Sequence, residues 1–220
     1  MSEASRIGLR RKAAQAEGGV EYTAKRQRLI RTAALVFREK GYTSATLSDV
    51  AAEFGTDRAS LYYYVGSKEE LFQECIQGIL DDNLARGVGI VAGDLGSRQK
   101  LEQLVEVVMA SYAANYPLMY VYIQEDMSQV TSQTTAWATR MVAQTKRMQQ
   151  LFLDVLRDGV AEGSFREDLS VKVVGNSLFG MLNWTHRWFV PGKDLDVPEL
   201  SRTVTSIFCD GFSKAPANQP

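Results

Sequence analysis

The sequence predicts an all-α fold with a small N-terminal part and a larger C-terminal part. Apolar residues recur three and four positions apart through most of the 220 residues, which is the spacing of one helix face. Glycine, proline and small polar residues separate these stretches, as they do at helix ends. The chain is 45% hydrophobic, which is enough to bury a core.

Residues 1–22 are predicted to form a flexible basic arm. They contain Arg6, Arg10, Arg11 and Lys12, few apolar residues and no helical stripe. Two interpretations stay open. The arm touches phosphate or the minor groove of DNA, or it is a disordered tail without defined contacts.

A first helix is predicted from Thr23, where the apolar pattern becomes helical. Its stripe consists of Leu29, Ile30, Ala33, Ala34 and Phe37. Gly41 is a natural stop, because glycine adopts the conformation of a helix C-terminus without strain. This helix is expected to pack beneath the pair of helices that follows.

The stretch Thr46–Lys68 has the spacing of a helix-turn-helix, in which a supporting helix and a recognition helix cross at a steep angle. A small residue at Ala51 lets the two helices approach. Gly55 permits a positive φ where the chain leaves the first helix, and Leu61 packs against the pair from the far side. The motif predicts DNA binding.

Each helix of this motif has its own predicted start. Thr46 offers a hydroxyl cap to the first helix, and the second opens at Thr56 or Asp57. The outward end of the second helix then carries Arg58, Ala59, Ser60, Tyr62 and Tyr63. A cation, small residues and aromatic rings with polar tips suit the major groove of DNA.

Charge is unevenly distributed along the chain. The net charge is -1, but residues 1–68 hold 12 Lys+Arg and 7 Asp+Glu, a balance of +5. Residues 69–220 hold 13 and 19, a balance of -6. A cationic N-terminal third on an acidic body is typical of a protein that binds DNA with one of its parts.

At these residues the sequence resembles the tetracycline-repressor (TetR) family of transcription regulators. The similar landmarks are LVFREKGY (Leu35–Tyr42) and SATLSDVAAEFGTDRASLYYYVGSKEEL (Ser44–Leu71). The resemblance covers roughly residues 24–80. It implies an N-terminal three-helix helix-turn-helix DNA-binding domain followed by a larger helical ligand-binding and dimerisation domain.

The family pattern is not matched everywhere. Tyr64 and Val65 replace the usual histidine and phenylalanine, and Phe54 stands where alanine is common. These departures leave the fold prediction intact but bear on how the recognition helix is braced. The predicted arm, DNA-binding domain and ligand-binding domain comprise residues 1–22, 23–68 and 69–214.

DNA contacts are assigned partly from chemistry and partly from the resemblance. Arg58 is predicted to read a guanine edge, because its planar fork matches N7 and O6. Thr46, Tyr62, Tyr63 and Lys68 are assigned to phosphates, and the resemblance implies that Ser48, Ala59 and Ser60 lie near base edges. The alternative for Tyr62 to Tyr64 is packing against the first helix. The predicted set is Thr46, Ser48, Thr56, Arg58, Ala59, Ser60, Tyr62, Tyr63 and Lys68.

A second observation supports a phosphate contact at Lys68. It stands as a bare positive charge at the start of a predicted helix, against the helix dipole, and an anionic partner would explain it. The resemblance likewise implies that Lys68 holds a phosphate.

A fourth helix is predicted from the capping box Ser67–Glu70, and the resemblance implies that it links the two domains. Gly87, Gly89, Gly93 and Gly96 are expected to break its pattern. Ser97 is then expected to cap a fifth helix, which ends at Asn115-Tyr116-Pro117.

Further helices follow in order. A short one runs through Met127, and a long one runs from about Thr134 to Glu162. Ser170 can cap the next, which is expected to include Trp188 before Pro191-Gly192 stops it, and the last starts near Asp196.

The last two helices are apolar on more than one face, so they need a second covering surface. The resemblance implies a two-fold four-helix bundle between two copies, and hence a homodimer. Two recognition helices would then enter successive major grooves about 34 Å apart, which predicts a pseudo-palindromic operator in double-stranded DNA.

Aromatic and methionine residues cluster in the larger part. Any one of them is more often a core residue than a pocket residue, but the resemblance raises the chance of a cavity for a small-molecule effector. The predicted effector-binding set is Tyr112, Tyr116, Met119, Tyr120, Trp137, Met141, Trp184, Arg187 and Trp188.

The segment GMLNWTHRWFVPG, Gly180–Gly192, is similar to one in family members that respond to acyl-CoA thioesters of lipid or steroid breakdown. By this resemblance Arg187 would meet a phosphate or carboxylate, and His186 would hydrogen-bond an acyl group. The alternative is that both lie at the dimer seam or in solvent.

The residue inventory argues against the other functional classes. One histidine and two cysteines in apolar stripes give no nucleophile-base pair and no metal spacing, so we expect no catalytic site, metal or cofactor. No run of 18 apolar residues predicts a membrane span, and no signal peptide is evident, so we expect a cytoplasmic protein. The predicted function is a ligand-responsive transcriptional regulator, with repression as the family default. The alternatives are a small helical enzyme or a helical interaction protein without DNA-binding function.

Overall fold

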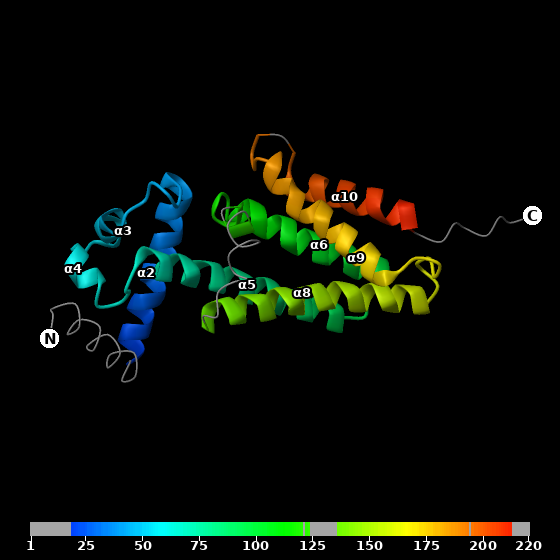
Figure 1. Ribbon diagram of the computed structural model, residues 1–220, viewed down its shortest axis with the longest axis horizontal. Helices are drawn as coiled ribbons and strands as arrows, with labels where there is room; N and C mark the ends of the chain where they lie inside the picture. Colours follow the sequence, from blue (N-terminus) through cyan, green and yellow to red (C-terminus); the bar gives the residue numbers. More distant parts are fainter. Residues whose placement is uncertain (1–18, 121, 124–135, 194, 213–220) are drawn as a thin grey trace, which may run out of the picture. The chain divides into compact units, whose positions relative to one another are not determined.

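The structure is a computed structural model that describes residues 19–120, 122–123, 136–193 and 195–212. The regular elements assigned within these ranges are helices, which confirms the all-α prediction (Figure 1). The contacts divide the chain into two compact units: unit 1, which ends at Gly78, and unit 2, which begins at Ile79. This division lies inside helix α5 (Lys68–Ala92), beyond the predicted boundary at residue 68.

Unit 1 contains α2 (Val20–Lys40), α3 (Leu47–Phe54), α4 (Arg58–Leu61) and the first turns of α5. Its buried apolar residues include Leu29, Ala33, Phe37, Val50, Ala51, Leu61, Val65, Leu71, Phe72 and Ile76. Because α2 begins at Val20, the last residues of the predicted arm are helical. The rest of the arm, residues 1–18, lies outside the described residues.

The first turns of α5 belong to unit 1 because they complete its core. Leu71, Phe72 and Ile76 are buried there, and the Cys75 thiol donates to the carbonyl oxygen of Ile30 at 3.4 Å. Burial raises the pKa of Cys75 to about 12, so this thiol is neutral and acts as a small apolar side chain.

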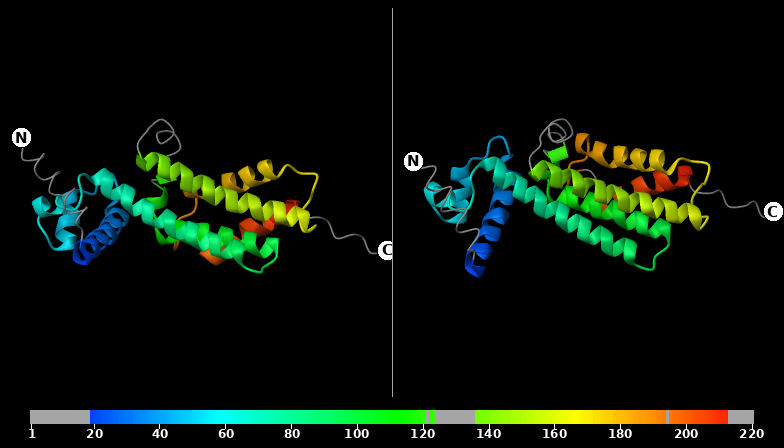
Figure 2. Two further views of the ribbon diagram at one scale, coloured as in Figure 1. Left: turned by 90° about the horizontal axis from the view of Figure 1, so that it is seen from below. Right: turned by 60° about the horizontal axis from the view of Figure 1, so that its bottom comes forward.

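Unit 2 is a bundle of α-helices. It contains the rest of α5, α6 (Ser97–Ala114), α8 (Ala136–Ala161), α9 (Val171–Trp184), the 3₁₀ turn η2 (Thr185–Arg187) and α10 (Val197–Phe212). Helix α6 runs through the middle of this bundle and contacts α8, α9 and α10 (Figure 1). Helix α8 lies alongside the second half of α5, where Arg140 and Gln144 contact Asp81 (Figure 2).

The prediction that glycines interrupt the fourth helix was wrong for Gly87 and Gly89, because α5 continues through both to Ala92. At Gly87 the reason is packing. A Cβ there would lie 3.0 Å from Leu151 Cδ1, so glycine permits the close approach of α5 to α8. Gly89 has open space around it, and the helix carries it without such a contact.

Three predicted helix ends also need correction or confirmation. Ser97 is the first residue of α6 and not its cap; Gly96 precedes it, and the Ser97 N–H donates to Glu162 at 3.1 Å. Helix α9 ends at Trp184 and not at Trp188, because the Thr185 hydroxyl bonds the Leu182 carbonyl at 2.6 Å in a tighter turn. Helix α10 starts next to Asp196 as predicted, and the Asp196 carboxylate accepts from the Glu199 N–H at 2.7 Å.

Two predicted elements are tested only in part. The short helix through Met127 reaches into residues 124–135, which lie outside the described residues, and so does the predicted start of the long helix at Thr134. Within the part of the chain that the structure covers, no helix is both long and apolar enough to cross a bilayer.

Candidate functional site

Helix α3 starts with a reciprocal cap that fixes its first turn. The Thr46 hydroxyl accepts from the Asp49 N–H at 3.2 Å, and the Asp49 carboxylate accepts from the Thr46 N–H at 2.8 Å. Lys40 contacts the same carboxylate at 2.6 Å, and this ammonium, followed by the Thr46 bonds, lowers the pKa of Asp49. Thr46 therefore serves the helix start within the chain, and its predicted phosphate contact stays a prediction.

The turn between α3 and α4 has the geometry that the spacing predicts. Gly55 has φ +79°, in the left-handed region that favours glycine. Its N–H donates to Ala52 O at 3.2 Å, and the Thr56 N–H donates to Ala51 O at 2.9 Å. These two bonds close the end of α3 and engage the Thr56 backbone. The Thr56 side chain is half-buried, whereas the predicted base contact Ser48 is exposed.

Helix α4 has only four residues and depends on its cap and on one buried side chain. The Asp57 carboxylate accepts from the Ser60 N–H at 2.8 Å and from the Ser60 hydroxyl at 2.7 Å. These bonds, the backbone one first, lower the pKa of Asp57. Leu61 is 0% exposed, so it anchors the helix from beneath and leaves Arg58, Ala59 and Ser60 exposed on the outer side.

The outer side of α4 also positions a cation next to a phenol. Arg58 Nη2 donates to the Tyr62 hydroxyl oxygen at 3.1 Å, and the guanidinium carbon lies 5.8 Å from the Tyr62 ring centroid. Tyr62 is half-buried and Tyr63 is 39% exposed. The structure thus pairs Arg58 with Tyr62 next to the exposed Ala59 and Ser60. The Tyr63 ring packs edge-on against Tyr22 of α2 at 5.7 Å, the alternative left open from the sequence.

Tyr64 and Phe54, two departures from the family pattern, lie close together. Their ring centroids are 6.5 Å apart, and Tyr64 also stacks on Tyr22 of α2 at 5.4 Å. Arg28 lies 4.7 Å from the Phe54 ring centroid and donates to the Phe54 carbonyl at 3.1 Å. Tyr64 therefore packs against the first helix, the alternative left open from the sequence, and this aromatic cluster braces the chain after α4.

Lys68 has partners within unit 1. Its ammonium donates to the carbonyl oxygens of Tyr42 at 2.6 Å, Thr43 at 3.2 Å and Ala45 at 2.9 Å. It also lies 4.5 Å from the Tyr42 ring centroid. These carbonyl groups account for a cation at the start of α5, so an anionic partner is not required to explain Lys68. Its predicted phosphate contact stays a prediction.

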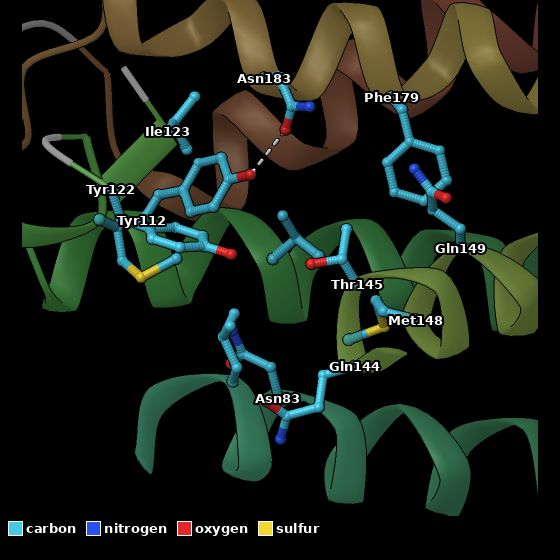
Figure 3. Close-up of a pocket in the computed structure, with 13 residues that line it drawn as sticks. Asn83, Tyr112, Tyr122, Ile123, Gln144, Thr145, Met148, Gln149, Phe179 and Asn183 are labelled. Atoms are coloured by element: carbon cyan, nitrogen blue, oxygen red, sulfur yellow. Dashed lines mark hydrogen bonds between the residues drawn. The ribbon is translucent and has the colours of Figure 1, made fainter. Parts of the chain in front are cut away.

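Unit 2 contains a cavity of about 130 Å³ between α5, α6, α8 and α9 (Figure 3). Its lining is apolar side chains with amides and hydroxyl groups among them. The lining residues are Leu80, Asn83, Val108, Tyr112, Met119, Tyr122, Ile123, Gln144, Thr145, Met148, Gln149, Phe179 and Asn183. None of these lining side chains carries a charge at neutral pH.

The polar groups of the cavity are held by hydrogen bonds. Tyr112 donates to Asn183 Oδ1 at 2.9 Å, as Figure 3 shows, and burial raises the pKa of Tyr112 so that the phenol stays neutral. Asn83 Nδ2 donates to the Ser111 hydroxyl at 2.8 Å in a buried setting. Asn183 Oδ1 already accepts from Tyr112, and the Nδ2 hydrogens of this amide can donate to a bound molecule.

The predicted effector-binding residues lie at different depths. Tyr112 and Met119 line the cavity. Tyr116, Tyr120 and Met141 do not: Met141 is 0% exposed in the core, and the Tyr120 hydroxyl donates to Phe189 O at 3.1 Å. Burial raises the pKa of Tyr120 to about 12, and Tyr116 packs edge-on against it at 5.2 Å.

The remaining predicted effector residues lie outside the lining of this cavity or are not described. Trp184 is 61% exposed, Trp188 is 49% exposed, and Arg187 lies 5.4 Å from the Trp184 ring centroid. Trp184 is the last residue of α9, Arg187 is the last residue of η2, and Trp188 follows it. The side chain of Trp137 lies outside the described residues.

Sequence reasoning concentrated on aromatic residues and therefore missed the amides of the cavity. Their signal was a polar residue on an otherwise apolar helix stripe. Asn83 follows Leu80 by three positions, and Asn183 follows Phe179 by four, so each lies on the same helix face as its apolar neighbour. Within the described residues, no cluster of three His, Cys, Asp or Glu residues could hold a metal ion.

Comparison with known proteins identifies the architecture. Residues 29–75 match the family "Bacterial regulatory proteins, tetR family", and residues 94–212 match "Tetracyclin repressor-like, C-terminal domain". The HTH-type transcriptional repressor KstR2 of Rhodococcus jostii is 30% identical over 189 residues, covering 86% of this chain and 91% of the relative.

Solved structures agree in fold. The ketosteroid transcriptional regulator KstR2 of Mycobacterium tuberculosis has a TM-score of 0.74 at 28% identity, over 86% of this chain and 95% of that one. AibR, in complex with isovaleryl coenzyme A and operator DNA, has a TM-score of 0.68 at 17% identity, over 83% and 97%. The N-terminal match covers the capped helix pair, and the C-terminal match covers the cavity helices α6, α8 and α9. This chain belongs to the TetR family of bacterial transcription regulators.

Proposed function

We propose that the chain is a cytoplasmic repressor that binds a pseudo-palindromic operator as a homodimer and is released by a small hydrophobic or acyl-CoA-type effector. The observation that carries this proposal is the surface of α4, where Arg58, Ala59 and Ser60 are exposed above the fully buried Leu61. A recognition helix presents its side chains to the major groove in this way. The R. jostii relative KstR2 is named a transcriptional repressor.

The proposed DNA contacts fall into two kinds. Arg58 would read a guanine, with Ser48, Ala59 and Ser60 near base edges and Thr56 as a further contact. The predicted phosphate contacts are Thr46, Tyr62, Tyr63 and Lys68. The Thr46 hydroxyl and the Lys68 ammonium already form hydrogen bonds within the chain. We therefore expect Tyr62 and Tyr63 to contribute more to phosphate binding.

The proposed dimer would use the outer faces of α9 and α10. Val173, Trp184 and Ile207 are 63%, 61% and 64% exposed in the single chain. Gly180 lies between the first two, and a Cβ there would meet no atom within 4 Å. Glycine inside a helix costs about 1 kcal/mol relative to alanine, and no contact among the described residues requires a glycine at this position. Close approach of a second helix would explain both features.

Light scattering tests this interface. Gly180→Leu is expected to yield monomers at concentrations where the wild type is dimeric, because the added side chain fills the space for the second helix. Gly89→Leu, also at an open helical position, serves as the control. A Gly180→Leu protein that stays dimeric would place the interface elsewhere.

The cavity supports an effector with a small uncharged end. Its volume of about 130 Å³ is similar to that of engineered cavities of roughly 150 Å³ that bind benzene. A ring-sized or short branched acyl group would fit, and Asn183 Nδ2 could donate to its carbonyl oxygen. The phosphates of coenzyme A would find no cation in the lining, so they would lie outside, where the exposed Arg187 is a candidate partner.

Release requires only that the effector bind one conformation better than another. A ligand that prefers the conformation without DNA by about 100-fold shifts the equilibrium by about 2.7 kcal/mol per site. We propose α5 as the element that carries this shift, because it contributes Leu80 and Asn83 to the cavity and its first turns to the core of unit 1.

Selection from a pool of random DNA duplexes tests the proposal. Purified full-length protein should recover a pseudo-palindromic sequence, and the dimer should bind it with an affinity that falls steeply as salt rises. Isovaleryl-CoA should weaken this binding, whereas free coenzyme A should do so less. The alternatives, a helical enzyme or an interaction protein without DNA-binding function, predict no selected sequence.

A further inference from the structure

Arg58 and Tyr62 form an internal pair on the surface proposed to face DNA. They are four positions apart and therefore share one helix face, and Arg58 Nη2 lies 3.1 Å from the Tyr62 hydroxyl oxygen. Tyr62 is half-buried and follows directly after the fully buried Leu61, so its ring is held more firmly than the exposed Arg58. An arginine side chain is otherwise rich in rotamers.

The carboxylate next to Arg58 in the sequence already has hydrogen-bond partners. Asp57, the adjacent carboxylate, accepts from the N–H and from the hydroxyl of Ser60. Among the described residues, the contacts of the Arg58 guanidinium are those to Tyr62. Because that hydrogen bond uses one donor, the guanidinium keeps others for a bidentate pair with a base.

The phenol has a hydrogen-bonding group to spare. Its oxygen accepts from Arg58, and its O–H remains able to donate, for which a DNA phosphate is a suitable acceptor. We propose, on the basis of the function proposed above, that Tyr62 is a positioning residue. Its hydroxyl oxygen accepts from Arg58 and so positions the guanidinium at the base edge. The same hydroxyl donates to a DNA phosphate and so links the guanidinium to the DNA backbone. Tyr62 then sets sequence preference at one base pair and not only overall affinity.

Tyr62→Phe separates this role from packing, because it keeps the ring and removes only the hydroxyl. With the full-length protein and its selected operator, discrimination at the base pair read by Arg58 should fall about three- to tenfold, as expected for one hydrogen bond. Discrimination at the other operator positions should not change. Arg58→Ala should remove discrimination at the same base pair, a loss of about 5- to 100-fold.

The pair should also be coupled in a double-mutant cycle. If Tyr62 acts through Arg58, adding Tyr62→Phe to Arg58→Ala should leave discrimination at that base pair unchanged. Tyr63→Phe is the matched control: it removes the neighbouring hydroxyl, and Tyr63 contacts Tyr22 and Tyr64 through its ring. Because Tyr63 is proposed as a phosphate contact, Tyr63→Phe should lower affinity equally for all operator variants. Thermal unfolding of each variant checks that the fold is kept.

The outcomes are distinct. An equal loss of affinity for every operator variant in Tyr62→Phe would make Tyr62 a phosphate contact only and overturn the inference. So would additive effects of the two substitutions on discrimination at the Arg58 base pair. Failure of the wild type to select any sequence would instead overturn the proposed function, and this inference with it.

Discussion

The surface of unit 1 that we propose faces DNA and the cavity of unit 2 are built in different ways. The residues of the first come from one continuous stretch, Thr46 to Lys68, and its geometry is fixed by caps between neighbours such as Asp57 and Ser60. The cavity gathers side chains from α5, α6, α8 and α9, and also Met119, Tyr122 and Ile123, which follow α6. A surface made from local bonds is readable in sequence, whereas a cavity made from distant helices depends on their packing.

A substitution in one region should therefore impair the binding function of that region and leave the other intact. The largest effect is expected for Leu61→Ala, because this fully buried side chain is the anchor of a four-residue helix. Loss of a buried leucine typically costs about 2–5 kcal/mol, which should abolish operator binding. Effector binding to unit 2, measured by calorimetry with isovaleryl-CoA, should persist. Loss of both activities together would contradict the separation of the two regions.

A smaller effect is expected inside the cavity. Tyr112→Phe removes the hydroxyl that donates to Asn183. This loss should let the amide reorient and lower the affinity for isovaleryl-CoA about three- to tenfold. Operator affinity without effector should stay unchanged. Tyr120→Phe is the matched control, because that buried hydroxyl bonds Phe189 O and lies outside the cavity lining. Equal losses of effector affinity in both variants would show that this cavity is not the effector site.

The sequence predicted the geometry of the helix-turn-helix better than it predicted the cavity, for a physical reason. Thr46, Gly55 and Leu61 have roles set by residues within a few positions, and the structure shows each in that role. Trp184 and Trp188 are predicted effector contacts because aromatic residues cluster there and the family resemblance implies a cavity, but both rings are exposed at and after the end of α9. Asn83 and Asn183 line the same cavity although they are 100 residues apart in the sequence. No local sequence pattern predicts that they lie close together.

Helix α5 takes part in both regions and offers a test of how they communicate. Gly78 lies at the division between the units, and neither Gly78 nor Gly89 has an atom within 4 Å of a Cβ position. Alanine at either should stabilise the helix by about 0.5–1 kcal/mol. If α5 bends at Gly78 during release, only Gly78→Ala should reduce the effect of isovaleryl-CoA on operator binding. Identical release in Gly78→Ala and Gly89→Ala would exclude that bend.

The smallest expected effect concerns pH and should appear in unit 1. The pKa values of Asp49 and Asp57 are lowered by the hydrogen bonds of the two caps, and for Asp49 chiefly by Lys40. A lowered folded-state pKa gives stability that is present above the unfolded value near ~3.9 and is lost as the pH falls below it. Operator binding at pH 7 should therefore be insensitive to small pH changes, and helix content should fall in acid.

Circular dichroism of Asp49→Asn checks this sign. The variant should begin from lower stability at pH 7 and lose less of it between pH 5 and pH 3 than the wild type. An unchanged acid response in Asp49→Asn would mean that this cap does not contribute to the pH dependence.

The central claim is that unit 1 binds an operator and that unit 2 controls this binding through an effector. Linkage requires that both ligands affect each other equally at equilibrium. We would measure operator affinity with and without saturating isovaleryl-CoA, and effector affinity with and without operator. The account predicts that each ligand weakens the other by the same factor. Tight effector binding that leaves operator affinity unchanged would contradict it.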